Sequence, residues 1–153
     1  MARKARNLPN NMTRRAWSLL LTALSCVLAL PSCVETDAVE EFVRRDEARA
    51  GVYVYKLDLP DTTAAYDVWF YSRTGERPLE SVRMNVQWLA PSGEAFFETV
   101  YMRRVDPRGT KELYRSGVVP AQAGEWQLSV RPVDVDEDFL GLGVIYKKKN
   151  GTR

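Results

Sequence analysis

The sequence predicts an all-β protein, an antiparallel β-sandwich of Ig-like or jelly-roll type with about seven strands. Three observations support this fold class. From Gly51 onward, apolar and polar residues alternate with a period of two, in short runs rich in β-branched and aromatic residues. Clusters of Pro, Gly, Asp and Ser separate these runs at short and regular spacing. No run has the length and the 3.6-residue period of a long helix.

Seven runs are expected to be strands. The run 82–89 is the clearest, because its even-numbered residues are apolar and its odd-numbered residues up to Gln87 are polar. Such alternation is typical of a sheet with one buried face and one face in water. The other expected strands are 52–59, 66–72, 95–103, a short one around Leu113-Tyr114 and Val118-Val119, 125–131 and 139–147.

Glycine and proline mark special backbone positions in this pattern. Pro91-Ser92-Gly93 lies between two strong strand runs, so it predicts a hairpin in which Gly93 supplies a positive φ. Gly141 and Gly143 lie inside an expected strand, where glycine marks a bulge or the close approach of another backbone.

Residues 34–50 differ from this pattern, because charges of both signs crowd every face of the segment. The spacing of Val39, Phe42 and Val43 favours one or two helical turns at most. We therefore expect a tether over residues 33–50, the sandwich domain over 51–149 and a short tail over 150–153.

Residues 1–32 have the composition of a signal peptide. They hold five basic residues and no acidic one, followed by the uncharged apolar run 16–30. That run is shorter than the roughly 20 residues that a membrane-spanning helix needs. An export signal that is cleaved is therefore favoured over a transmembrane anchor.

The end of this segment, Leu30-Pro31-Ser32-Cys33, resembles the lipobox of bacterial lipoproteins. The resemblance implies that Cys33 carries the lipid and becomes the new N-terminus, since a multi-chain anchor holds stably in a membrane. The expected location is the outer membrane, with the domain on the periplasmic side or at the cell surface. Cys26 is a weaker alternative for the lipidated residue. The remaining alternative is that Cys33 is an ordinary thiol.

Charge and composition exclude several function classes. The chain has no His, which removes Ser-His-Asp and Cys-His catalysis and His-ligated zinc. Five of the 22 basic residues and none of the 20 acidic ones lie in 1–32, so residues 33–153 carry 17 basic and 20 acidic side chains and a formal charge of −3. An exported acidic domain is a poor nucleic-acid binder. Without a phosphate-binding loop or a nucleophile motif, we expect a protein that is not an enzyme.

Two groups of residues are candidate ligand sites. Trp69 and Tyr71 could form an aromatic platform for a glycan; the alternative is that their strand is central, buried on both faces or packed under the tether. Asp134, Asp136 and Asp138 alternate in a loop and could bind Ca²⁺, the only cofactor considered; the alternative is a solvated loop.

Short motifs in the domain resemble the gliding-motility lipoprotein H family of the Bacteroidota, over residues 38–149. The motifs are Tyr66-Asp67-Val68, Glu98-Thr99-Val100, Asp106 with Gly109, Tyr114-Arg115, Gly124-Glu125-Trp126-Gln127-Leu128 and the stretch 139–147. The resemblance implies an envelope lipoprotein with a β-sandwich and no catalytic residues. It would act with other envelope proteins as a structural component of a membrane-associated assembly of the gliding or secretion type. The alternative is a surface lipoprotein that binds a glycan, with or without Ca²⁺.

Overall fold

The structure is a computed structural model, and it describes residues 38–149. The predicted signal peptide, Cys33 and the tail 150–153 lie outside the described residues. Among residues 38–149 there is no candidate for a membrane-spanning helix. The strands are β1 (Ala38–Arg44), β2 (Tyr53–Leu59), β3 (Tyr66–Thr74), β4 (Val82–Leu89), β5 (Ala95–Met102), β6 (Thr110–Val118), β7 (Gly124–Val133) and β8 (Phe139–Lys148).

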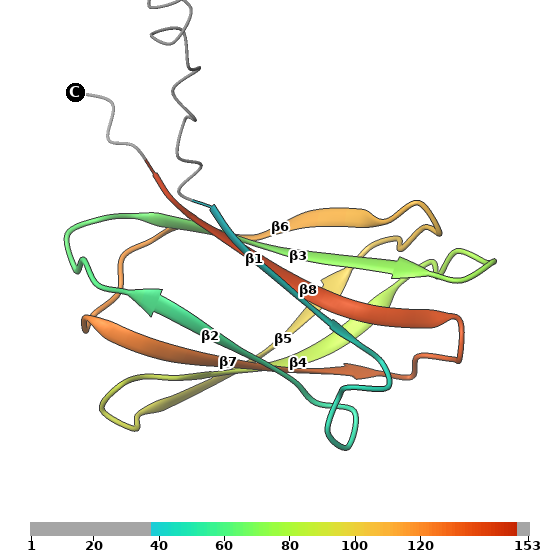
Figure 1. Cartoon of the computed structure of the whole chain (residues 1–153), viewed down its shortest axis with the longest axis horizontal. Helices are drawn as coiled ribbons and strands as arrows, with labels where there is room; N and C mark the ends of the chain where they lie inside the picture. Colours follow the sequence, from blue (N-terminus) through green and yellow to red (C-terminus); the bar gives the residue numbers. More distant parts are fainter. Residues whose placement is uncertain (1–37, 150–153) are drawn as a thin grey trace, which may run out of the picture. The chain divides into compact units, whose positions relative to one another are not determined.

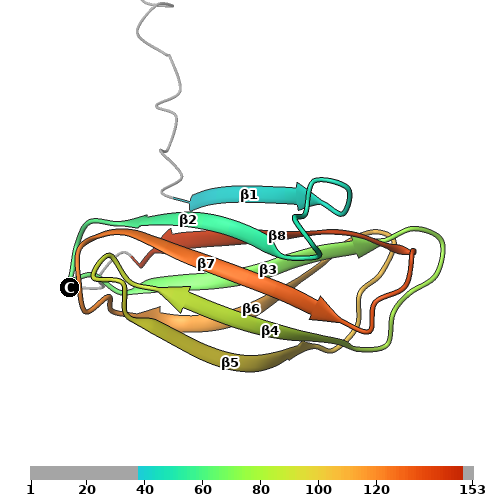
Figure 2. The ribbon, with the colours of Figure 1, turned by 90° about the horizontal axis from the view of Figure 1, so that it is seen from below.

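The strands form two four-stranded antiparallel sheets that face each other (Figures 1 and 2). One sheet has the order β1-β8-β3-β6 and the other the order β2-β7-β4-β5. The pairs β1–β8, β2–β7, β3–β6 and β4–β5 alternate between the two sheets, as in a long hairpin that has been rolled up. This is jelly-roll topology. The predicted all-β sandwich is confirmed, and the jelly-roll alternative is the one observed.

The core lies between the sheets and follows the predicted alternation. Every second residue of β2 is buried, from Tyr53 to Leu59, and the residues between them face water. The largest fully buried side chains come from both sheets, and include Tyr55, Phe70, Phe139, Met84 and Leu128. The predicted hairpin is present, since the Gly93 N–H donates to Ala90 O at 2.9 Å and Gly93 has a φ of +88°.

Residues 38–44 correct the prediction for the tether. They form β1, which pairs over its whole length with β8 and has no helical turn. Glycines on β8 make this possible, because a Cβ at Gly141 would lie 2.5 Å from the Val43 carbonyl oxygen and 2.8 Å from the Phe42 ring. The expected close backbone approach at these glycines is therefore confirmed. The sandwich begins at Ala38, thirteen residues before the predicted boundary at Gly51.

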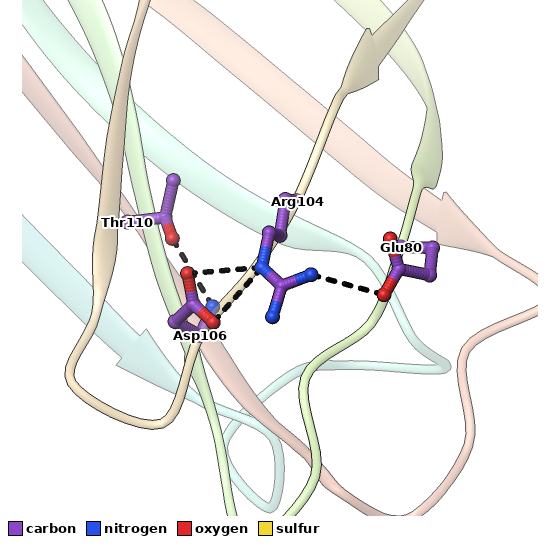
Figure 3. Close-up of polar contacts among 4 residues, drawn as sticks. All are labelled: Glu80, Arg104, Asp106 and Thr110. Carbon is purple, nitrogen blue, oxygen red and sulfur yellow. Dashed lines mark hydrogen bonds and ion pairs between the residues drawn. The ribbon is translucent and has the colours of Figure 1, made fainter.

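Loops at one end of the sandwich are joined by ion pairs. Arg104, in the β5–β6 loop, contacts Glu80 in the β3–β4 loop at 3.0 Å and Asp106 in its own loop at 3.1 Å (Figure 3). The Asp106 N–H donates to Thr110 Oγ1 at 3.1 Å. Leu79 and Val105 also pair through their backbones. These contacts hold the two loops together.

Candidate functional site

Trp69 and Tyr71, the predicted platform, lie half-buried on the outer face of the central strand β3. The ammonium of Lys111 sits 4.6 Å from the centre of the Trp69 ring. The Phe42 ring of β1 meets Tyr71 edge-on at 5.8 Å, and the Gly109 backbone packs against the Tyr71 hydroxyl. Other parts of the chain therefore cover each ring in part, and both rings keep some exposure.

The three aspartates proposed for Ca²⁺ do not converge. Asp134 points to Arg83 at 3.0 Å, whereas Asp138 pairs with Arg77 at 2.8 Å and Asp136 lies 3.9 Å from the same guanidinium. Among residues 38–149 no group of three or more His, Cys, Asp or Glu side chains is placed to hold a metal ion. Each of these carboxylates therefore has an arginine beside it.

A cleft of about 350 Å³ opens at the other end of the sandwich. It lies between β5 and β6, the edge strands of the two sheets, and close to the β6–β7 loop. Its volume falls within the range of small-ligand sites. The lining is mainly apolar with one charged pair, and consists of Leu59, Trp88, Phe96, Glu98, Arg115, Val118, Val119, Pro120, Ala121 and Trp126.

Aromatic side chains form one wall of this cleft. Trp88 of β4 and Trp126 of β7 meet edge-to-face at 6.2 Å, and the Trp126 Nε1–H donates to Gln122 O at 3.0 Å. Both rings are thus fixed in place. Phe96 of β5 is 48 % exposed at the mouth of the cleft. A ligand that enters the cleft meets one exposed ring backed by two rigid ones.

The polar wall is a chain of hydrogen bonds that crosses between the sheets. Arg115 Nη2 donates to Glu98 Oε2 at 2.5 Å, and the Tyr114 hydroxyl donates to Glu98 Oε1. Trp88 Nε1–H donates to the Tyr114 oxygen at 2.8 Å. Each carboxylate oxygen can accept a second bond, and the guanidinium keeps further N–H donors. The wall therefore offers donors and acceptors at fixed positions.

A β-bulge in β6 directs two neighbouring side chains toward this wall. Leu113 and Arg115 pair with Trp69 and Val68, which are consecutive in β3, so Tyr114 is an extra residue. An extra residue lets successive side chains leave the strict alternation of a strand. Tyr114 and Arg115 can therefore both reach Glu98, while Leu113 stays 50 % exposed on the outer face.

The side chains of this wall keep their protonation states near neutral pH. Burial raises the pKa of Glu98, but the hydrogen bonds from Arg115 and Tyr114 outweigh it and leave the pKa below its usual value. Burial and the hydrogen bond to Glu98 raise the pKa of Tyr114 to about 12. The hydrogen bond to Glu98 raises the pKa of Arg115. Glu98 is thus an anion, Arg115 a cation and Tyr114 a neutral donor.

The alternation in 82–89 predicts an inward face for Trp88, but it does not indicate the cleft. One signal was visible: Glu98 interrupts the apolar inner face of β5, between Phe96 and Val100. A charge at such a position needs a partner. The partner, Arg115, lies on the other sheet beside a bulge, and neither the pairing nor the bulge follows from the local pattern.

No family model and no curated protein matches this chain. One solved structure is similar, a family 11 carbohydrate-binding module from Clostridium thermocellum in complex with a β-1,3-1,4-mixed-linked tetrasaccharide, at 10 % identity. The match covers 72 % of this chain and 80 % of that chain, with a TM-score of 0.31.

Proposed function

We propose that this chain is a lipid-anchored protein of a bacterial envelope whose sandwich domain binds a saccharide in the β5–β6 cleft. The observation that carries the binding role is the cleft of about 350 Å³ in which exposed Phe96 lies beside the Glu98–Arg115 pair. The anchor is supported by the sequence Leu30-Pro31-Ser32-Cys33.

A saccharide suits both walls of the cleft. The C–H-rich face of a sugar ring is apolar and meets the negative face of an aromatic ring favourably. The hydroxyl groups at the ring edge can donate to Glu98 and accept from Arg115. A purely apolar ligand would leave these two charged groups without any new partner. The cleft is open, so a ring within a longer chain can enter it as well as a terminal ring.

Binding is expected to depend on Phe96. We expect at least one member of an array of neutral oligosaccharides, four to six residues long, to bind the full chain in detergent. Phe96→Ala should weaken that binding at least tenfold, because it removes the exposed stacking surface; titration calorimetry measures the change.

Phe97→Ala is the matched control. Phe97 is the adjacent residue of the same type, 74 % exposed, but it points to the outer face of its sheet, away from the cleft. Equal affinity of Phe96→Ala and the unchanged chain would refute the cleft as the binding site. An array on which nothing binds would refute the saccharide.

Cys33 is expected to carry the lipid. Cells that express the chain and are fed labelled palmitate should label it, and Cys33→Ala should abolish the label. Cys26→Ala serves as the control, because Cys26 lies inside the apolar run 16–30 and is expected to be removed with the leader. Label that persists in Cys33→Ala would rule out this anchor.

The other role expected from the sequence, a structural component of a gliding or secretion-type assembly, stays a prediction. Its direct test is affinity purification from envelopes, in which a stoichiometric partner is expected.

A further inference from the structure

β5 is an unprotected sheet edge. It is the outermost strand of the β2-β7-β4-β5 sheet, so one side of its backbone has no strand partner among residues 38–149. It pairs with β4 through eight consecutive residues without a register shift, so no bulge bends it. Its sequence AFFETVYM contains one charge, and that charge, Glu98, is paired with Arg115. It also lacks proline.

The other three edge strands, β1, β2 and β6, have features that hinder pairing with the edge of another sheet. Charged side chains stand on β1 at Glu40 and Glu41 and on β2 at Lys56 and Asp58. β6 has two register irregularities in addition to its charges. Charges and bulges are the usual protection of a free edge, and a long, flat, hydrophobic edge without them readily pairs with another strand. β5 therefore stands apart from the other edges of the same molecule.

The exposed side chains of β5 are self-complementary. Phe97 is 74 % exposed and Tyr101 59 %, and both point to the outer face with Thr99 midway between them. When two antiparallel copies of a strand pair about a two-fold axis at residue 99, residue 97 of each copy lies opposite residue 101 of the other. The aromatic side chains then form two cross-strand pairs around a central Thr–Thr pair, which are favourable combinations.

We propose that two copies of this chain associate through antiparallel β5–β5 pairing centred on Thr99, which joins two four-stranded sheets into one. Pairing centred on Glu98 is disfavoured, because it places two carboxylates opposite each other. The interface is isologous, as closed dimers require. It does not depend on the proposed saccharide site.

Cysteine cross-linking tests the register. In full chain with Cys26 and Cys33 replaced by Ser, purified in detergent, Thr99→Cys should oxidise to a covalent dimer. Directly opposite residues in an antiparallel pair have the Cα separation that a disulfide needs. The control is Asn85→Cys, on the same face and opposite Thr99 on β4. In the proposed dimer the two copies of residue 85 are three strand spacings apart, about 14 Å, so it should not cross-link.

Sedimentation tests the association without any cross-link. Tyr101→Lys should raise the dimer dissociation constant at least tenfold, because it removes both aromatic cross-strand pairs and places on the edge a lysine of the kind that protects free edges. Leu113→Lys is the control, since Leu113 is 50 % exposed on the outer face of the other sheet. A chain that stays monomeric at tens of micromolar, or that cross-links equally through residues 85 and 99, overturns the proposal.

Discussion

Phe70→Ala is expected to lower the free energy of unfolding by about 3–5 kcal/mol, the range for removal of a buried aromatic ring. Phe70 is 2 % exposed, and its ring stacks on Tyr114 at a centroid distance of 4.4 Å. The substitution opens a cavity and also removes the support beneath Tyr114. Urea unfolding followed by tryptophan fluorescence gives the free energy.

The same variant tests whether the core positions the cleft. Tyr114 donates to Glu98 and accepts from Trp88, so a loosened Tyr114 disturbs both walls. We expect Phe70→Ala to lose saccharide affinity at temperatures where it is still folded. Leu113→Ala, the residue before Tyr114 with its side chain in water, should change stability by less than about 0.5 kcal/mol. A Phe70→Ala variant as stable as the unchanged chain would show that the two sheets do not pack as described.

Gly141→Ala is expected to lower the free energy of unfolding by about 3 kcal/mol, through overpacking and backbone strain together. Gly141 has a φ of +157°, and an added Cβ would lie 2.5 Å from the Val43 carbonyl oxygen. That atom belongs to backbone, which cannot swing aside as a flexible side chain can. β1 has to move away from β8, so its amides should lose protection from hydrogen exchange.

Gly117→Ala separates the two causes. Gly117 has a φ of +69°, but an added Cβ would meet no atom within 4 Å. The substitution should therefore lower the free energy of unfolding by only about 1 kcal/mol, the cost of a positive φ for a residue with a Cβ. Equal losses in the free energy of unfolding for Gly117→Ala and Gly141→Ala would mean that β1 does not pack closely against β8. If Gly141→Ala left the protection of the β1 amides from hydrogen exchange unchanged and lowered it in other strands, the same conclusion would follow.

Strands that the alternating pattern marks clearly were predicted closely. The run 82–89 coincides with β4, and 66–72 falls inside β3. The period of two in β4 reflects one buried face and one face in water, which local sequence records directly. β1 was missed because its pairing with β8 depends on Gly141 and Gly143, about a hundred residues further along the chain.

The binding site was harder to predict than the fold for a related reason. Trp69 and Tyr71 were chosen as exposed aromatics, but exposure depends on what covers a face, and Phe42 and Lys111 cover theirs. The exposed ring of the cleft, Phe96, looks no different in sequence from a core residue. Its surroundings are set by the pairing of Glu98 with Arg115 across two sheets.

The position of β1 also limits how far the domain can stand from a lipid on Cys33. Four residues separate Cys33 from Ala38, where β1 begins. Even fully extended, that stretch reaches only about 17 Å. With Cys33 lipidated as proposed, every copy is confined to a thin layer along the membrane. Copies then meet by diffusion in two dimensions, and confinement of this kind raises their effective concentration, so that even a weak contact between β5 edges becomes populated.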